Sequence, residues 1–163
     1  MSIFAVRRRV ACYITRAGAG GLELLVFDHV DDDPADPSGV QIPAGGMLAF
    51  EGIEQASLRE TAEETGLTTV TYEGQVGAQE RGLDDPDGPT MTTYVHLVAV
   101  AAGPDQWLHT VTTLHPAALD ASAAPADVAE DEGLVFGCRW VPLPLGEPLA
   151  DGQDEFLNLL PDA

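Results

Sequence analysis

The chain has no lysine: all seven of its basic residues are arginine, against 27 acidic residues, and the formal net charge is −20. A surface of this charge repels nucleic acid, so non-specific binding to DNA or RNA is not expected. The lack of lysine fits either a GC-rich genome or adaptation to salt, and composition does not separate the two. Any anionic ligand must therefore depend on local cations, either bound metal ions or the few arginines.

Cysteine is scarce as well, and long apolar runs are missing. Cys12 and Cys138 each lie in a short apolar run, which favours two buried thiols over a disulfide. No apolar run approaches the roughly 18 residues that a membrane span needs, and the first residues lack the apolar region of a signal peptide. We therefore expect a cytoplasmic protein that does not contact membranes.

The length of 163 residues and a hydrophobic content of 45% fit a single globular domain over residues 1–163. Apolar alternation and turn residues predict a series of strands, with a short terminal helix over Asp151–Leu160 that has Asp151 as its N-cap. The predicted strands are Phe4–Thr15, Leu22–His29, Val40–Pro43, Val70–Arg81, Thr92–Ala101, Gln106–Thr113 and Leu134–Val141. Strands on both sides of one central helix indicate an α+β or mixed α/β sandwich.

The central helix ends at Gly66 and carries three acids that project from one face. Glu60, Glu63 and Glu64 are related by steps of three and four residues. Leu58 and Ala62 point the opposite way and can pack. Like charges at this spacing repel by roughly 0.2–0.5 kcal/mol per pair. A hard divalent cation such as Mg²⁺ would turn that repulsion into a binding site.

The alternative is a solvated acidic helix face on an acidic protein. Two features favour a site instead. Arg59 lies directly beside the acids, and Gly45 and Gly46 precede the helix, where bare backbone N–H groups can approach an anion closely.

The stretch from Gly45 to Leu67 resembles the Nudix box, G-x5-E-x7-R-E-U-x-E-E-x-G-U, where U is a bulky aliphatic residue. Every specified position matches except Thr61, which stands at the first U position; the matching residues are Gly45, Glu51, Arg59, Glu60, Glu63, Glu64, Gly66 and Leu67. Thr is close to Val in shape, so only a small packing change is expected. The turn before the helix also departs from the family, because Leu48, Ala49 and Phe50 replace an acid, a proline and a glycine.

The resemblance implies a Nudix fold, a mixed sheet between helices, and a hydrolase that cleaves the diphosphate linkage of a nucleoside diphosphate joined to another group X. It implies Mg²⁺ or Mn²⁺ as cofactor, with Glu60, Glu63 and Glu64 as metal ligands and Glu51 as a weaker candidate. Arg59 is expected to orient these carboxylates, and Glu60 or Glu64 to double as general base. Gly45 and Gly46 are expected to let the loop pass close to metal or phosphate.

Family members often supply the base from a loop before the last strand. Glu130, Asp131 and Glu132 occupy such a loop here, and the alternative is that they are ordinary solvated acids. The resemblance also leaves open a module of the same fold that binds a nucleotide without cleaving it, and the altered turn is the feature that favours this reading. A homodimer is compatible with the sequence, and a small-molecule nucleotide is the expected partner.

The substrate is not determined by the sequence. Trp107, Tyr94 and Phe136 are candidates for stacking on a base. In the three-arginine run of the first strand, Arg7 and Arg9 share one face. We interpret this as a solvated strand face, with contact to a substrate phosphate as the alternative.

Overall fold

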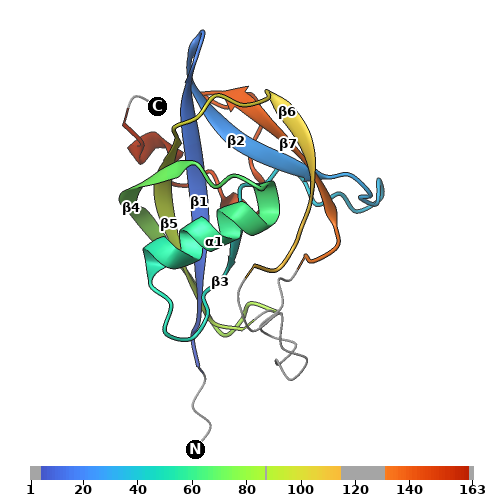
Figure 1. Cartoon of the computed structure of the whole chain (residues 1–163). Helices are drawn as coiled ribbons and strands as arrows, with labels where there is room; N and C mark the ends of the chain where they lie inside the picture. The colour runs from blue at the N-terminus through green and yellow to red at the C-terminus, as the bar shows by residue number, and fades with distance from the viewer. Residues whose placement is uncertain (1–4, 87, 115–130, 162–163) are drawn as a thin grey trace, which may run out of the picture.

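The computed structural model describes residues 5–86, 88–114 and 131–161. In the described part of the chain, strands flank a single α-helix, α1 (Ile53–Thr65), and two short 3-10 turns follow near the end. The strands are β1 (Arg7–Gly18), β2 (Gly21–His29), β3 (Ala44–Gly46), β4 (Val70–Arg81), β5 (Thr90–Ala99), β6 (Gln106–Thr110) and β7 (Val135–Pro142). They form one mixed sheet in the order β4-β5-β1-β2-β7-β6, with β3 paired to β1 (Figure 1). The predicted mixed α+β class is confirmed.

Strand β1 organises the sheet because it has partners along its whole length. It runs parallel to β5 from Arg7, opposite Thr90, to Thr15, opposite Val98. On its other side it pairs antiparallel with β3 near its beginning and with β2 near its end. The chain thus passes from β3 directly into α1 beside the first half of β1.

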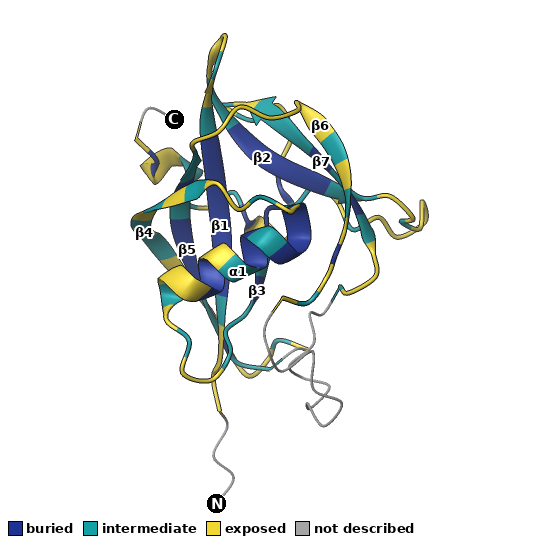
Figure 2. Cartoon of the chain, viewed as in Figure 1, coloured by how far each residue is buried: buried dark blue, intermediate teal, exposed yellow. Residues whose placement is uncertain are grey.

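Each face of the sheet is covered by a different layer. Helix α1 lies across one face, over a core that includes Cys12, Ile14 and Phe136 (Figures 1 and 2). The C-terminal segment covers the other face, where Leu149 and Leu160 pack in a second core; that core also contains Ala11, Tyr13, Leu24, Val26, Ile42 and Tyr94. Burial of these apolar side chains drives both layers onto the sheet.

Two predicted elements were wrong. The strand expected at Val40–Pro43 is a single bridge between Gln41 and Phe27, and the strand is Ala44–Gly46 instead. Proline lacks the N–H that a ladder needs, so pairing starts only after Pro43. The expected helix over Asp151–Leu160 is replaced by 3-10 turns at Ala150–Gly152 and Leu157–Leu159. Both Asp151 (φ 55°) and Gly152 (φ 68°) adopt the left-handed region, which no α-helix accommodates.

Both cysteines are free and buried, as predicted. Among the described residues, no helix is long and apolar enough to cross a membrane.

Candidate active site

Helix α1 buries its acidic face, which reverses the sequence-based expectation. Glu60, Glu63 and Glu64 are 6%, 0% and 4% exposed, whereas Leu58 lies at the surface. The helix ends at Gly66, whose φ of 79° is the left-handed conformation typical of a helix C-cap. The prediction that the Leu58 side packs was wrong, because the acidic face is the one that meets the β3 strand and its partners. Burying three carboxylates costs free energy unless each has hydrogen-bond or ion-pair partners. The partners of these three carboxylates therefore define the site.

Arg59 is the main compensating group. Its Nε and Nη2 atoms donate to the two carboxylate oxygens of Glu51 at 2.7 and 2.9 Å, a bidentate pair. Its Nη1 donates to Glu60 at 2.9 Å and to Glu63 at 3.2 Å, and Nη2 also donates to the Gly46 carbonyl at 2.9 Å. Burial by itself would lower the pKa of Arg59, but the bonds to Glu51 and the neighbouring carboxylates raise it above its usual value. Arg59 therefore stays charged and ties the β3 loop to the helix.

The unusual turn before α1 still delivers Glu51 to Arg59. The Leu48 N–H donates to Glu51 Oε1 at 3.0 Å, and the Glu51 N–H donates to the Leu48 carbonyl at 3.2 Å. Phe50 takes φ 64° with its side chain fully exposed. Phe50 thus takes the left-handed conformation at the position where the family pattern has glycine. The turn still places Glu51 as the partner of Arg59.

Glu63 shares Arg59 with Glu60 but also bonds to a different segment of the chain. Its Oε2 accepts from Arg59, and its Oε1 accepts from the backbone N–H of Leu114 at 3.1 Å. His109 Nε2 lies 3.0 Å from the Glu63 carbonyl. In this conformation both carboxylate oxygens are engaged, so Glu63 connects the helix to the segment after β6.

Glu60 and Glu64 are the two acids of the cluster whose pKa values are raised. Glu64 Oε1 accepts the N–H of Ala44 at 2.8 Å, and Glu60 Oε1 accepts Arg59. Gly45 lies directly against Glu60, since a Cβ there would be 2.3 Å from the Glu60 carboxylate carbon. Burial, only partly offset by Arg59, raises the pKa of Glu60 to about 7, with Glu63 adding to the rise. Burial and then the charge of Glu60 raise the pKa of Glu64 well above its usual value.

The fit of a divalent cation can be judged from these donors. In residues 5–86, 88–114 and 131–161, no group of three or more His, Cys, Asp or Glu side chains is arranged to hold a metal ion by itself. Glu60 and Glu64 are nevertheless buried carboxylates, and the charge of Glu60 raises the pKa of Glu64. In the described part of the chain, no residue hydrogen-bonds to the second oxygen of either. Two carboxylates are enough protein ligands for Mg²⁺, because this ion prefers oxygen donors and keeps waters and substrate phosphates as its other ligands. The residues therefore fit such an ion.

The acids before the last strand are only partly described. Glu130 lies outside the described residues. Glu132 is exposed. Asp131 is half-buried, and its charge contributes to the raised pKa of Glu64. Of the two described acids of this loop, Asp131 is the one whose charge acts on the buried cluster.

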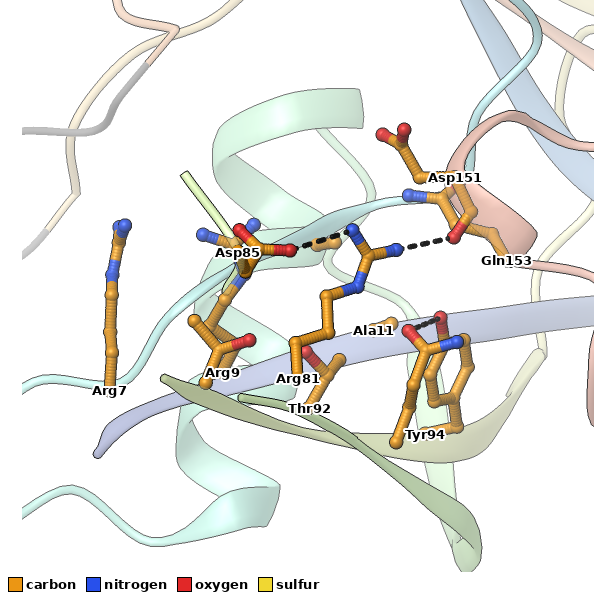
Figure 3. Close-up of a pocket in the computed structure, with 12 residues that line it drawn as sticks. Arg7, Arg9, Ala11, Arg81, Asp85, Thr92, Tyr94, Asp151 and Gln153 are labelled. Carbon is orange, nitrogen blue, oxygen red and sulfur yellow. Dashed lines mark hydrogen bonds and ion pairs between the residues drawn. The ribbon is translucent and has the colours of Figure 1, made fainter. Parts of the chain in front are cut away.

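Arginines Arg7, Arg9 and Arg81 line a pocket of about 320 Å³ beside β3 (Figure 3). The register of three strands brings them together: Arg7 pairs with Thr90, which pairs with Arg81 on β4. Arg9 follows Arg7 on the same face of β1, whereas Arg8 points to the opposite face. Arg7 is exposed and Arg9 is half-buried, which agrees with a solvated strand face, and pairing with β5 and β4 makes this face the wall of a pocket. Contact of these arginines with a substrate phosphate stays a prediction.

The pocket and the carboxylate pair are neighbours across β3. Ala44 lines the pocket and donates its N–H to Glu64. Arg9 lines the pocket too, and its charge partly offsets the raised pKa values of Glu60 and Glu64. Basic side chains and buried carboxylates thus lie on either side of one short strand, an arrangement that can place a phosphate against a cation held by the carboxylates.

None of the three aromatic residues proposed to stack on a base presents an accessible ring face to this pocket. Phe136 is 0% exposed and stacks on Phe27 in the core, with ring centroids 4.1 Å apart. Tyr94 lines the pocket but is only 2% exposed. Trp107 donates to the Thr65 carbonyl at 2.8 Å and lies near the C-terminal end of α1, in a different pocket. The prediction that Tyr94 or Phe136 is available for stacking was wrong.

The profile of the NUDIX domain matches residues 5–160, nearly the whole chain. This chain belongs to the NUDIX domain family. The family assignment made from the box is therefore confirmed. A comparison with curated proteins gave no match.

Solved structures share the Nudix fold. The NUDIX domain of Shewanella oneidensis NrtR, complexed with ADP ribose, has a TM-score of 0.62 at 17% identity, over 96% of this chain and 87% of that one. A UDP-X diphosphatase has a TM-score of 0.58 at 8% identity, over 98% of this chain and 63% of that one. A C. elegans Ap4A hydrolase binary complex has a TM-score of 0.54 at 18% identity, over 85% and 81%. Identities this low show the fold alone.

Thr61 is the one specified box position that departs from the Nudix pattern, and Gly45 and Gly46 differ in how closely they are confined. Thr61, at the aliphatic position, is 0% exposed, and its hydroxyl has no hydrogen-bond partner among the described residues. Gly46 is less confined than Gly45, because a Cβ there would meet only the Arg7 guanidinium at 3.5 Å. The box glycine that the geometry requires is thus Gly45, for its contact with Glu60.

Proposed function

We propose that this Nudix hydrolase cleaves the diphosphate linkage of a nucleoside diphosphate joined to another group X, with water as the nucleophile and Mg²⁺ or Mn²⁺ as cofactor. The observation that carries the proposal is the pair of buried carboxylates, Glu60 and Glu64, next to a pocket lined by three arginines. Carboxylates alone would repel a diphosphate. Together with arginines they form a site that accepts a cation and its phosphate ligands at once.

Glu60 and Glu64 are the proposed metal ligands. A divalent cation held there would neutralise charge on the diphosphate and lower the pKa of a bound water. Glu63 was predicted to join them, and in the present conformation it bonds to Arg59 and to the backbone near Leu114. We assign it the role of positioning Arg59, together with Glu51.

The proton of the attacking water needs an acceptor with a pKa near neutrality. Burial raises the pKa of Glu60 to about 7, so this carboxylate can accept a proton near neutral pH when it is not bound to metal. Glu64, whose pKa burial and the charge of Glu60 raise well above its usual value, is the other candidate within the box. The acids of the loop before β7 are the other candidates. Asp131 is the described member of that loop whose charge acts on Glu64, while Glu130 and Glu132 remain candidates from the sequence.

The arginine pocket is proposed to orient the substrate. Arg9 is the link, because it lines the pocket and acts on both carboxylates. An arginine at this place can hold a phosphate oxygen while the cation holds its neighbour, which keeps the reacting phosphorus in line with the attacking water.

The test is a release assay across nucleotide sugars, ADP-ribose, dinucleoside polyphosphates and nucleoside triphosphates, with and without Mg²⁺ or Mn²⁺. Metal-dependent cleavage of one class is expected. Glu64→Gln should lower kcat by at least about 10²-fold. Glu54→Gln is the matched control, because Glu54 is an exposed acid on the same helix. Glu64→Gln with full activity would contradict the proposal. Nucleotide binding without any cleavage would support the binding-module alternative.

A further inference from the structure

A second pocket lies at the C-terminal end of α1, on the face of the sheet that the helix covers. Its volume is about 370 Å³, which is within the usual range for small-molecule sites. We call it the tryptophan pocket, because both tryptophans of the chain line it and both are half-buried. Its described lining includes Arg16, Gly66, Pro104, Trp107, His109 and Trp140.

The tryptophan pocket is separate from the arginine pocket. Side chains alternate between the two faces of a strand, so Ala11 and Arg16 of β1 lie on opposite faces of the sheet. Ala11 lines the arginine pocket and belongs to the core under the C-terminal segment. Arg16 lines the tryptophan pocket, whose Trp107 and Trp140 pack against the core under α1. A ligand of this pocket therefore does not occupy the place proposed for the diphosphate.

His109 gives the tryptophan pocket a hydrogen-bond acceptor. Its Nε2 lies 3.0 Å from the Glu63 carbonyl oxygen, which can only accept, so in the neutral ring Nε2 carries the proton and Nδ1 accepts. In the described part of the chain, no residue donates to Nδ1. Gly66 leaves the space beside this atom clear, since a Cβ there would lie 3.0 Å from Nδ1. The indole N–H of Trp107 is already used, because it donates to the Thr65 carbonyl at 2.8 Å. A ligand must therefore bring a donor.

The charges around the tryptophan pocket do not favour an anion. Arg16 donates to Glu23 at 2.8 Å and to Asp105 at 2.7 Å, so two carboxylates balance this guanidinium. The guanidinium carbon also lies 4.6 Å from the centroid of the Trp140 ring. The last turn of α1 has no basic residue, so the helix end that lines the pocket keeps its partial negative charge. An anionic ligand would meet that charge without a free counter-charge.

We propose that the tryptophan pocket binds a small, uncharged, flat aromatic molecule that carries an N–H or O–H donor. The donor bonds to His109 Nδ1, and the ring packs against Trp107 and Trp140, because aromatic rings favour stacked and edge-to-face contacts with one another. The loop at Pro104 and the end of α1 bound the pocket, and its volume suits a single ring system. This binding site goes beyond the proposed function and does not depend on it.

The test titrates three matched compounds into the intact protein by calorimetry. Indole is flat and uncharged and has one donor, benzofuran has the same shape with an oxygen in place of the N–H, and indole-3-carboxylate adds a negative charge. Indole is expected to bind at least about threefold more tightly than benzofuran, which is the effect of one net hydrogen bond. It is also expected to bind more tightly than indole-3-carboxylate. Either compound binding as tightly as indole would overturn the proposal.

A fourth compound separates a free small molecule from a side chain of a protein partner, which could present the same ring. N-acetyltryptophanamide carries the indole ring on a peptide-like backbone. It is expected to bind more weakly than indole, because the pocket has room for a single ring system. Tighter binding of N-acetyltryptophanamide would overturn the small-molecule proposal in favour of a docking site for a protein.

The two tryptophans show where the ligand binds. Because both line this pocket, the two indole N–H resonances in the NMR spectrum of nitrogen-labelled protein both report on it. Unlabelled indole is expected to shift both resonances with the affinity measured by calorimetry. If neither resonance moves at saturating indole, the ligand binds elsewhere and the assignment of this pocket is wrong.

A variant tests the acceptor. His109→Phe keeps an aromatic ring and removes Nδ1, so the preference for indole over benzofuran should disappear. The Thr112 N–H still donates to the Glu63 carbonyl at 3.3 Å, so the helix end keeps a partner in this variant. Leu108→Ala is the matched control on the same strand, because this side chain is 70% exposed and points to the opposite face. A preference for indole that persists in folded His109→Phe would reject the role of Nδ1.

Discussion

Gly45→Ala is the sharpest single perturbation of the carboxylate pair. The added Cβ would lie 2.3 Å from the Cδ atom and 2.3 and 2.4 Å from the two oxygens of Glu60. Ordinary van der Waals contact begins at 3.4 Å, so the carboxylate must retreat by about 3.4 − 2.3 = 1.1 Å. The end of a flexible side chain can make that move, so the fold is expected to survive while the carboxylate leaves its place.

A displacement of about 1 Å in a catalytic group typically costs about 10²-fold in rate, which is about 2.7 kcal/mol of transition-state stabilisation. We expect kcat to fall by that factor with metal-dependent hydrolysis as the assay. The stabilising effect of Mg²⁺ on thermal unfolding should shrink as well, because Glu60 is one of the two proposed ligands. This second readout does not depend on the substrate.

Gly46→Ala is the matched control, since its Cβ would meet Arg7 Nη2 at an ordinary 3.5 Å. Its effect on kcat should be small by comparison. If Gly45→Ala kept the kcat of the wild type and its response to Mg²⁺, the placement of Glu60 in the reaction would be refuted. Equal losses in both variants would show that the loop, and not the Glu60 contact, is responsible.

Three further outcomes are expected. Thr61→Val should raise the free energy of unfolding by about 1 kcal/mol, because it removes a buried hydroxyl that has no hydrogen-bond partner among the described residues. Thr65→Val removes a hydroxyl that donates to a backbone carbonyl at 2.6 Å, so it should lower the free energy of unfolding. Both are measured by the same denaturant titration. Because burial raises the pKa of Glu60 from 4.5 to about 7, the metal-free folded state retains a proton that the unfolded chain loses above pH 4.5. Its stability should therefore fall between pH 5 and 7, with Mg²⁺ restoring more at pH 8 than at pH 5 in thermal melts; a flat profile would contradict this. Asp131→Asn should lower kcat at least about tenfold, and Glu132→Gln should leave it nearly unchanged. Equal kcat values for the two variants would show that the acids of this loop are ordinary solvated side chains.

The burial of the acidic helix face explains why Arg59 is needed. Breaking a buried ion pair by removing one partner typically costs about 3–5 kcal/mol. Arg59 bonds to Glu51, Glu60 and Glu63 at once. Its replacement would leave several buried carboxylates without a counter-charge, so losses of stability and of activity are inseparable at this position. Glu60 and Glu64 each have one oxygen that accepts no hydrogen bond from the described residues, so their substitution separates stability from activity better.

The sequence by itself determined the local features of this protein. Residue spacing within one helix is set by the helix alone, so the pattern from Arg59 to Gly66 placed the three acids and Arg59 correctly relative to one another. Apolar alternation likewise located Val70–Arg81 to the residue. The short strand before the box was misplaced by a few residues, and the terminal helix was missed because left-handed Asp151 and Gly152 interrupt it.

The tertiary structure alone decided which faces are buried. An all-polar helix face reads as solvated until its partners are known, and here those partners are the Ala44 N–H, Arg59 and the Leu114 N–H. The arginine pocket has the same origin, because it depends on the pairing of Arg7 with Thr90 and of Thr90 with Arg81. Such pairings join residues far apart in the chain, and no local pattern in the sequence records which strands will meet or in which register.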